Sequence, residues 1–394
     1  MARRGKGEGS IFKRKDGRWC GFITLGYDEK GNQKKKFFYG KTRQEVAEKI
    51  NQALNELKQG VLIAEGNITL EEWLRTWLWE YKRPQISEST FDDYESIIRN
   101  HINPVLGKYK LKDLRPEHLQ HLYNEKFKAG LSPRRIKHIH TILHASLEQA
   151  IKSGLIVRNV SKATTLPKDT KEKEIRVLTL EEQKKLLEAL EGERLKAAFI
   201  LALTTGMRLG EILGLKWDRV DLENKQITVV RSLRRIKSRD NSEIKTKTVL
   251  TLKEVKSEKA NRIIPIPDIA YEELLKYREQ QEEEKNKAGS AYRDSGFVFT
   301  TEVGTPIEPR NFIRTFERIV KKAGLDVNFH ALRHTFATRL LEKNVHPKVV
   351  QELLGHSDIT TTLNTYSHVL DTVKKEAIKE IDCVFTELKK DNPT

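Results

Sequence analysis

One arginine, up to three histidines and one tyrosine lie close together near the C-terminus, and their types suit phosphoryl transfer. They are His330, Arg333, His334, His356 and Tyr366. An arginine binds phosphate through a planar fork of hydrogen-bond donors, and a histidine exchanges protons near neutral pH. A tyrosine among them has a phenol that can attack a phosphorus atom. The segment therefore indicates phosphoryl transfer through a covalent tyrosine, with no requirement for a metal.

Two of the histidines have a spacing that could also suggest a zinc site. His330 and His334 are four residues apart, as in the zinc-binding helix of metalloproteases. The glutamate of that motif is missing from the sequence, and Arg333 would repel a cation. We therefore predict no metal and no cofactor, and we assign His334 to its helix as a structural residue.

A second arginine lies far upstream, after an apolar helix that is predicted over residues 195–204. Gly206 is suited to the left-handed turn that ends a helix, and Arg208 follows it closely. A backbone held this firmly suits a preorganised phosphate clamp, in which Glu211 could orient the guanidinium. The alternative is an ordinary surface pair of Arg208 and Glu211, which would contribute little.

A lysine completes the set of candidates, because a leaving oxygen needs a proton. Residues 226–231 and 261–266 are predicted as the strands of a β-hairpin, with a long basic insertion over 232–253 between them. A lysine before the second strand could act as the acid if neighbouring arginines lower its pKa. The candidates are Lys253, Lys256 and Lys259. The alternative is a flexible lysine-rich turn.

Short elements must position these side chains. The sequence predicts helices over residues 330–342 and 345–354, with Gly355 ending the second helix. The following turn would carry a histidine, and Asp358 would cap a last short helix over 360–366. A tyrosine in such a helix, taken alone, is most often a half-buried structural residue.

The chain as a whole carries an excess of positive charge. Lys and Arg total 73 against 56 for Asp and Glu, which gives a formal net charge of +17 over 394 residues. This excess favours a polyanionic partner, above all nucleic acid. The alternative is a basic protein that is simply soluble.

The cysteine content and the length of the apolar runs indicate the cellular compartment of the protein. Cys20 and Cys383 are too few for a disulfide framework or a four-thiolate zinc site, and they fit a reducing cytosol. The basic start over residues 1–6 is followed by no apolar run, so no secretory signal is expected. The longest apolar stretch, 197–203, is too short to span a bilayer. We expect a cytoplasmic protein with no membrane partner.

Residues 1–62 are predicted to form a small domain with a three-stranded sheet and a helix. Strand patterns cover 10–15, 18–25 and 33–39, and a helix begins at Thr42. Basic and aromatic residues are interleaved along the strands, so the sheet could lie in a DNA major groove. The predicted contacts are Arg14, Lys15, Arg18, Trp19, Lys34 and Lys36. The alternative is a solvated charged face over a small core.

Residues 66–160 are predicted to form a helical bundle. A capping box of Thr69 and Glu72 precedes an apolar stripe that we assign to the core. Ser132 and Pro133 begin another helix, whose second face is basic. The candidate phosphate contacts on that face are Arg134, Arg135 and Lys137. An ordinary solvated basic face explains this helix equally well.

A polar segment over residues 160–176 is the predicted linker to a larger domain over 175–394. A capping box of Thr179 and Glu182 begins the first helix of that domain. The expected fold class is therefore a multidomain α+β protein. It combines a small three-stranded sheet plus helix, a helical bundle, and a mainly α-helical domain with a small antiparallel sheet.

Four motifs in the last domain occur together, in order. They are Thr205-Gly206-Met207-Arg208-Leu209-Gly210-Glu211, then His330-x-x-Arg333-His334-Thr335-Phe336-Ala337-Thr338, then Leu353-Leu354-Gly355-His356-Ser357, and finally Asn364-Thr365-Tyr366-Ser367-His368. Through them the sequence resembles the tyrosine recombinase family, also called the phage integrase family. The resemblance covers nearly the whole chain, and the two earlier domains look like an arm-type DNA-binding domain and a helical core-binding domain.

The resemblance implies a role for each matching residue. Arg208 and Arg333 would hold the non-bridging oxygens of the scissile phosphate, and His356 would support that phosphate. His330 would accept a hydrogen bond or a proton from the nucleophile. Tyr366 would attack, which gives a 3′-phosphotyrosine and a free 5′-hydroxyl.

A hairpin lysine would protonate the leaving oxygen in this family. The spacing to Arg262 and Pro265 favours Lys256, with Lys259 as the alternative, and Glu211 matches an acidic supporting position. The physical chemistry agrees, because a free phenol has a pKa of about 10 and needs a base or a cationic field. Two arginines would supply the charge stabilisation that a metal supplies elsewhere, and the covalent link would make ATP unnecessary.

The resemblance implies a site-specific DNA integrase of a mobile element, either a prophage or a conjugative transposon. It would cut and rejoin double-stranded DNA at core and arm attachment sites as a homo-tetramer, and the family implies an excisionase and a DNA-bending protein as further partners. A chromosome-dimer resolving recombinase is one alternative, although such proteins usually lack an arm domain. A DNA-binding regulator without catalysis is the other.

The last residues of the chain are also amphipathic. Residues 371–388 carry regularly spaced apolar side chains among charged ones. We expect this tail to pack against a neighbouring protomer of the tetramer.

Overall fold

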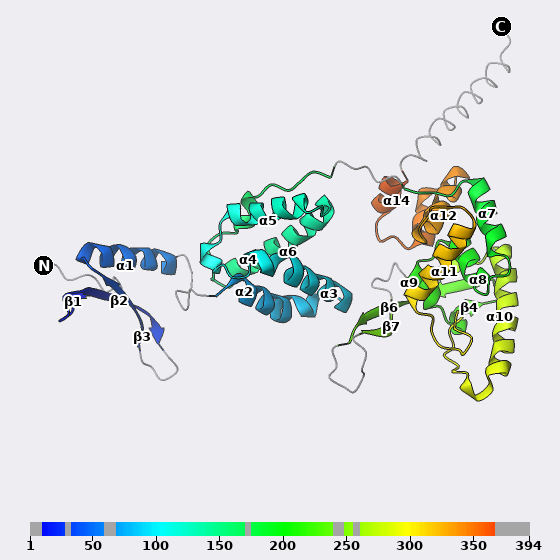
Figure 1. The fold of residues 1–394 in the computed structure, drawn as a ribbon, viewed down its shortest axis with the longest axis horizontal. Coiled ribbons are helices and arrows are strands. Elements are labelled where there is room, and N and C mark those ends of the chain that lie inside the picture. The colour runs from blue at the N-terminus through cyan, green and yellow to red at the C-terminus, as the bar shows by residue number, and fades with distance from the viewer. Residues whose placement is uncertain are drawn as a thin grey trace, which may run out of the picture. The chain divides into compact units, whose positions relative to one another are not determined.

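The computed structural model describes residues 10–27, 33–58, 68–169, 175–238, 248–254 and 261–366. The chain forms two compact units, residues 1–172 and 173–394 (Figure 1). Helices predominate and each sheet is small and antiparallel, which confirms the predicted fold class. Within the described ranges, no helix is long and apolar enough to cross a membrane. The tail over 371–388 lies outside the described residues.

The first unit begins with the predicted three-stranded sheet and helix. Its elements are β1 (Ser10–Lys13), β2 (Trp19–Tyr27), β3 (Gln33–Gly40) and α1 (Arg43–Lys58), and the strand order is β1-β2-β3. Thr42 Oγ1 accepts a hydrogen bond from Glu45 N at 3.1 Å, which confirms the predicted start of the helix. A Cβ atom on Gly21 would lie 2.6 Å from Ile50 Cδ1, so α1 covers the face of the sheet to which Gly21 belongs.

The rest of the first unit is the predicted helical bundle. Its α-helices are α2 (Leu70–Thr76), α3 (Glu88–Ile97), α4 (Asn103–Leu106), α5 (Pro116–Lys128) and α6 (Pro133–Lys152), with π-helical turns at η1 (Trp77–Lys82) and η3 (Ile98–Ile102) and 3-10 turns at η2 (Arg83–Gln85), η4 (Leu111–Asp113) and η5 (Val160–Ala163). The capping box of Thr69 and Glu72 is present, and Ser132 caps α6 as predicted. Trp73 and Leu143 are buried in one apolar core, as the stripe indicates.

The segment that was predicted as a linker begins as part of this bundle. Val160 is buried in the core and Ser161 is fully buried. Asn159 donates to the His144 carbonyl at 3.1 Å, and Gln120 exchanges hydrogen bonds with the backbone of Thr165. These polar contacts and the burial of Val160 fix the start of the segment. Its sequence resembles a free linker because it contains few apolar residues.

The second unit has a large apolar core and a smaller apolar cluster that contains Ala337, Leu341, Val350, Leu354 and Tyr366. Its helices are α7 (Leu180–Leu190), α8 (Lys196–Thr205), α9 (Leu209–Leu213), α10 (Asp268–Ala288), α11 (Pro309–Lys322), α12 (His330–Glu342), α13 (Pro347–Leu354) and α14 (Ile359–Thr365), with 3-10 turns at η6 (Trp217–Arg219) and η8 (Gly289–Ala291). Helix α8 is buried on most sides, and the capping box of Thr179 and Glu182 begins α7. The predicted helix ends at Gly206 and Gly355 are both confirmed, with φ angles of 64° and 63°.

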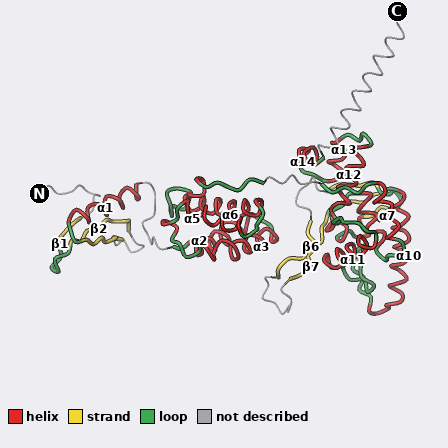
Figure 2. Tube along the Cα trace, turned by 45° about the horizontal axis from the view of Figure 1, so that its top comes forward, coloured by secondary structure: helices red, strands yellow, loops and turns green. Residues whose placement is uncertain are grey.

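The predicted hairpin of the second unit is confirmed, but its insertion has a structure of its own. Strands β4 (Val220–Asp221), β5 (Gln226–Val229) and β8 (Arg262–Pro265) form a sheet in the order β4-β5-β8. The inserted residues form a separate hairpin, β6 (Arg231–Lys237) and β7 (Thr248–Glu254) (Figure 2). Leu233 is buried opposite Leu252, and Arg235 forms a fork with Glu308 at the start of α11. Apolar and ionic contacts therefore anchor the hairpin to the rest of the unit.

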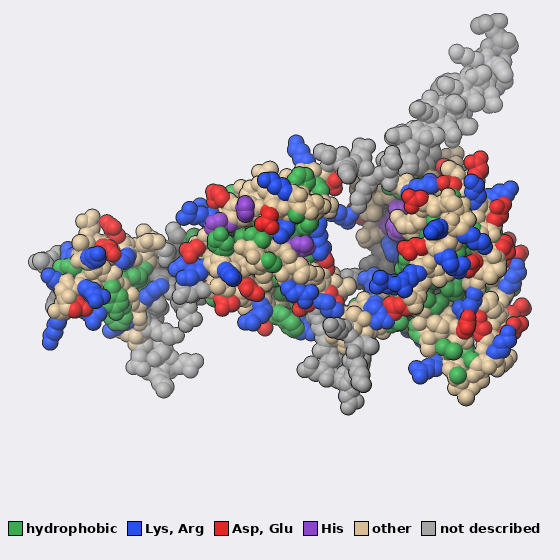
Figure 3. Space-filling model, in the orientation of Figure 1, with side chains coloured by type: hydrophobic (Ala, Val, Ile, Leu, Met, Phe, Trp, Pro, Cys, Tyr) green, Lys and Arg blue, Asp and Glu red, His purple; other side chains and the backbone are tan. Residues whose placement is uncertain are grey.

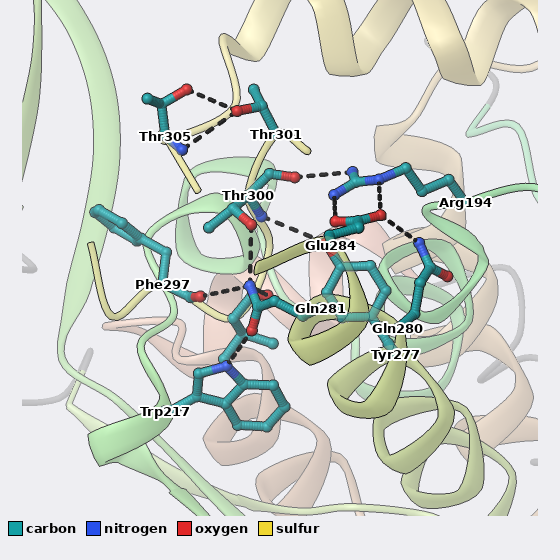
Figure 4. Close-up of polar contacts among 11 residues, drawn as sticks. Arg194, Trp217, Tyr277, Gln280, Gln281, Glu284, Phe297, Thr300, Thr301 and Thr305 are labelled. Atoms are coloured by element: carbon teal, nitrogen blue, oxygen red, sulfur yellow. Dashed lines mark hydrogen bonds and ion pairs between the residues drawn. The ribbon is translucent and has the colours of Figure 1, made fainter. Parts of the chain in front are cut away.

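A polar network fixes α10 against the loop that precedes α11 (Figure 4). Arg194 pairs with Glu284 of α10 and donates to the Thr300 carbonyl at 2.8 Å. Gln281 accepts from Trp217 Nε1 at 2.8 Å and donates to Thr300 Oγ1 at 2.9 Å. Because these buried polar groups find partners, the network holds this side of the core without cost from unsatisfied donors.

Candidate active site

Arg208 lies where a buried helix ends. Gly206 closes α8 in the left-handed conformation, and Arg208 is the residue that precedes α9. The carboxylate of Glu211 accepts from Arg208 N and from its Nη1, both at 2.9 Å. The Arg208 side chain keeps 39% of its surface exposed, so part of its guanidinium faces the solvent. This geometry agrees with the prediction that Glu211 orients Arg208.

Glu211 has a second partner that the sequence analysis did not include in the site. Arg262 Nη2 donates to Glu211 Oε2 at 2.8 Å, and Arg262 Nε donates to the Leu353 carbonyl at 2.7 Å. Burial raises the pKa of Glu211, but Arg262 and Arg208 outweigh burial and bring it to about 2. A sequence signal existed, because Arg262 shares the strand parity of the buried Ile264.

Arg333 joins the ends of two helices. It is 3% exposed, and its Nη1 and Nη2 donate to the carbonyls of Gly206 and Leu354, each at 2.7 Å. Burial lowers the pKa of Arg333, and the neighbouring Arg208 lowers it further. Three arginines therefore surround the single charge of Glu211, and this local excess of positive charge favours an anion.

The two predicted histidines are held neutral beside the arginines. Burial lowers the pKa of His356 to about 4, and the charges of Arg333 and Arg208 contribute. Burial also lowers the pKa of His330, with the same two arginines as further causes. His356 Nδ1 is hydrogen-bonded to Thr362 Oγ1 at 2.8 Å, which fixes its ring. Neutral imidazoles at pH 7 can accept protons or hydrogen bonds from a substrate.

Tyr366 lies at the end of α14 and is 1% exposed. Its phenol oxygen is 2.9 Å from Nδ1 of His334. Burial raises the pKa of Tyr366 to about 12, while the charge of Arg333 lowers it. His334 was assigned to its helix as a structural residue, and its contact with Tyr366 was not predicted. The i, i+4 spacing on α12 could have indicated it, because His330 and His334 share a face of the helix.

The clamp residues open onto a cavity of about 950 Å³. Among its lining residues are Met207, Arg208, Phe316, His330 and Arg333. The structure thus brings together three of the predicted site residues around one open space. His356 directly follows Gly355, whose carbonyl lies 3.4 Å from Arg208 Nη2, and Tyr366 is hydrogen-bonded to His334 on α12, whereas the lining of the cavity includes neither His356 nor Tyr366.

The predicted lysine is not placed by the structure. Lys256 and its alternative Lys259 both lie outside the described residues. Lys253, which is described, lies on β7 opposite Ser232. The assignment of the acid to Lys256 therefore remains a prediction from the sequence.

The predicted DNA contacts of the first domain lie partly on the sheet and partly in the turn between β1 and β2, which carries Arg14, Lys15 and Arg18. Trp19 shares the strand parity of Gly21 and is partly buried against the core under α1, so part of its ring is used in packing. Lys36 pairs with Ile23 on that same face. Arg14, Lys15 and Arg18 are exposed, and the side chain of Lys34 lies outside the described residues.

The opposite face of this sheet carries aromatic residues that the sequence analysis did not select. Phe12, Phe37 and Tyr39 are 44%, 47% and 49% exposed. Arg14 lies over the ring of Tyr39 and Lys35 lies over the ring of Phe22. Side chains alternate between the two faces along β3, so Phe37 and Tyr39 lie on the face opposite to that of Phe38. The contact of Gly21 with α1 shows that the face of Phe38 is the one that the helix covers.

The basic face of α6 is only partly available. Arg135 pairs with Asp93 at 2.9 Å, whereas Arg134 and Lys137 are exposed. Figure 3 shows Lys and Arg side chains over the visible surface of both units, interspersed with acidic ones. The charge excess is therefore spread over the chain rather than confined to the clamp.

Known proteins resemble this chain over most of its length. The profile of the phage integrase family matches residues 176–372, and that of a phage integrase N-terminal SAM-like domain matches residues 69–127. A tyrosine recombinase XerC-like protein of Caldanaerobacter subterraneus subsp. tengcongensis is 38% identical over 374 residues, which are 92% of this chain and 95% of that protein.

Two solved structures share the fold. The integrase of transposon Tn1549 in complex with transposon right end DNA is similar with a TM-score of 0.66 and 23% identity, over 79% of this chain and 99% of that chain. A lambda integrase tetramer bound to a Holliday junction is similar with a TM-score of 0.54 and 24% identity, over 89% of this chain and 96% of that chain.

Proposed function

Because the chain belongs to the phage integrase family of tyrosine recombinases, it is a site-specific recombinase that cleaves and rejoins DNA, and we propose that Tyr366 is its nucleophile. One observation carries this assignment. The buried phenol of Tyr366 lies 2.9 Å from His334 on α12, the helix that also carries His330 and Arg333 of the clamp with Arg208. A phosphodiester in that clamp would have its charge stabilised without a metal.

We infer the following reaction from these assignments. The phenol oxygen of Tyr366 attacks phosphorus, a 3′-phosphotyrosine bond forms, and the bond to the 5′ oxygen breaks. Arg208 and Arg333 bind the non-bridging oxygens, while His330 and His356 support them with neutral rings. The phenolic proton passes to a histidine, and the leaving 5′ oxygen takes a proton from a lysine, which we assign as Lys256. The reverse steps rejoin a strand, because the phosphodiester energy is kept in the covalent link.

Double-stranded DNA is the partner of the enzyme, and we assign parts of it to separate modules. The sheet-and-helix module would bind arm-type sites, and the helical bundle would bind core-type sites. Exposed aromatic rings flanked by Arg14 and Lys35 support the first assignment. The match to an integrase SAM-like domain over residues 69–127 supports the second.

We further propose that the chain acts as a homo-tetramer in the bacterial cytoplasm, on the ends of the prophage or conjugative transposon that encodes it. The similarity to a lambda integrase tetramer on a Holliday junction and to a transposon integrase supports this proposal. An excisionase and a DNA-bending protein would assist. The sheet-and-helix module distinguishes the chain from a chromosome-dimer resolving recombinase, which would not need arm sites.

A nicked duplex tests the chemistry directly. The probe carries the end of the encoding element, with a nick beside the cleavage position so that the short cut strand diffuses away and the adduct accumulates. In the presence of EDTA we expect wild type to form a covalent protein–DNA adduct and Tyr366→Phe to form none. An adduct in the variant, or cleavage that requires added metal, would refute the mechanism. Gel-shift binding by the variant controls for folding.

A further inference from the structure

We propose that His334 is a further catalytic residue, whose Nδ1 accepts the phenolic proton of Tyr366 during strand cleavage. The proposal rests on the nucleophilic role proposed for Tyr366. It departs from the expectation that His330 receives this proton. The starting observation is the distance of 2.9 Å between His334 Nδ1 and Tyr366 Oη, which is within hydrogen-bond reach of the reacting atom.

His330 and His334 both lie on α12, but they contact different parts of the site. His330 lines the open cavity together with Arg208 and Arg333, where a phosphate would bind. His334, one turn further along α12, faces Tyr366 instead. The two imidazole rings meet edge to face with centroids 4.6 Å apart. His330 is therefore placed for the phosphate, and His334 is placed for the nucleophile.

The surroundings of His334 keep it ready to accept a proton. The titratable and charged groups that act on it or border it are His330 and Arg333 on α12, His356 beyond α13, and Tyr366 at the end of α14. Burial lowers its pKa to about 4, and the proximity of His330 and Arg333 adds to the effect. At neutral pH the ring is uncharged, and with its proton on Nε2 the Nδ1 lone pair faces the phenol.

Proton transfer in the resting site is unfavourable, which links it to the arrival of DNA. The pKa of Tyr366 is raised to about 12, far above that of His334. A bound phosphate adds negative charge next to both groups and raises both pKa values, so the transfer depends on bond formation to phosphorus, which avoids a free phenolate. The proton then moves as the bond between oxygen and phosphorus forms and the bond to the 5′ oxygen breaks. On rejoining, His334 returns the proton to the departing phenolate.

Single-turnover kinetics on the nicked duplex in EDTA test this role. Asn can donate or accept a hydrogen bond but takes no proton at these pH values, so His334→Asn separates positioning from proton transfer. We expect its adduct formation at pH 7 to be about 100-fold slower than that of wild type, as for loss of a general base. Its rate should rise about tenfold per pH unit up to pH 9, because hydroxide removes the proton instead. The wild-type rate should be flat over that range.

A second variant measures rescue. Added imidazole should restore adduct formation by His334→Ala and should leave unchanged the rate of His346→Ala, a matched histidine that only caps α13. Gel-shift affinity for the same duplex shows that each variant is folded. The proposal would be overturned if His334→Asn formed the adduct at the rate of wild type and this rate did not change with pH. It would also be overturned by a loss of activity that neither high pH nor imidazole reverses. Failure of wild type itself to form an adduct would instead refute the proposed function.

Discussion

The carboxylate of Glu211 is ionised although it is buried, because it is paired with two arginines. Its carboxylate is 3% exposed and contacts Arg262, itself 6% exposed, and the more open Arg208. The desolvation of such a pair is offset only while both partners remain. At the scale of single residues, the phosphate clamp therefore depends on a carboxylate that touches no substrate. Glu211 and Arg262 are positioning residues for Arg208.

Replacement of Glu211 by glutamine should destabilise the second unit. Glu211→Gln leaves the buried Arg262 without a counter-charge, and we expect the free energy of unfolding to fall by about 3–5 kcal/mol. Urea denaturation measures this loss. The exposed pair of Lys285 and Asp294 provides the control, because Asp294→Asn should cost about 1 kcal/mol or less. An equal effect of the two substitutions would contradict the role of burial.

The pH dependence of the same variant checks the cause. The pKa of Glu211 lies at about 2 in the folded chain, below the ordinary value of 4.5, so its contribution to stability is present above pH 4.5. That contribution is lost as the pH falls from 4.5 towards 2. The difference in unfolding free energy between wild type and Glu211→Gln should therefore shrink over this window. A difference that stays constant would show that ionisation of Glu211 is not its source.

At the scale of elements, two helices end in left-handed glycines beside the clamp. The carbonyl of Gly206 after α8 accepts a hydrogen bond from Arg333, and that of Gly355 after α13 lies 3.4 Å from Arg208 Nη2. The last carbonyls of a helix have no partner within it, so they are free to hold arginines. The ends of these two helices therefore orient the guanidinium groups of Arg333 and Arg208 and also set the direction of the backbone that follows.

An alanine at Gly206 should affect both stability and cleavage. The backbone strain costs about 1–2 kcal/mol, and the added Cβ would lie 2.5 Å from Phe336 Cδ1. Gly324→Ala is the matched control, since its φ of 67° is similar but nothing lies within 4 Å of its Cβ. We expect Gly206→Ala to lower the melting temperature more than the control does, and to slow adduct formation because Arg333 loses its alignment. Cleavage at the control's rate would sink this argument.

Local signals in the sequence predicted the elements well. Capping residues such as Thr179 and glycines such as Gly355 act on neighbouring backbone groups, so their effect can be seen in a short window. The contacts that complete the site span long separations. Arg333 meets the carbonyl of a residue 127 positions away, and Arg262 meets one 91 positions away. A short window can show which face such a residue shares, as strand parity does for Arg262 and helical spacing does for His334, but it does not show the distant partner.

At the scale of the whole molecule, DNA binding and catalysis are carried by different parts of the chain. The described clamp residues all belong to the unit over 173–394, whereas the aromatic face of the three-stranded sheet belongs to the unit over 1–172. Affinity for arm-type DNA should therefore be separable from cleavage of a core-type duplex. Alternation on β3 supplies the residues for this test, because Phe37 and Tyr39 are exposed while Phe38 packs against the core.

Full-length chain with Phe37→Ala and Tyr39→Ala should bind an arm-site duplex about 10- to 100-fold more weakly, through lost apolar contacts to base edges. The affinity of this variant should depend on salt concentration as that of wild type does, because no charge is removed. Arg14→Ala with Lys35→Ala should instead lower the salt slope by about two, since each phosphate contact contributes roughly 0.9. Fluorescence anisotropy at several salt concentrations measures both. Cleavage of the nicked core duplex should be unchanged in all four substitutions; slower cleavage with intact arm binding would show that this sheet serves the catalytic unit instead.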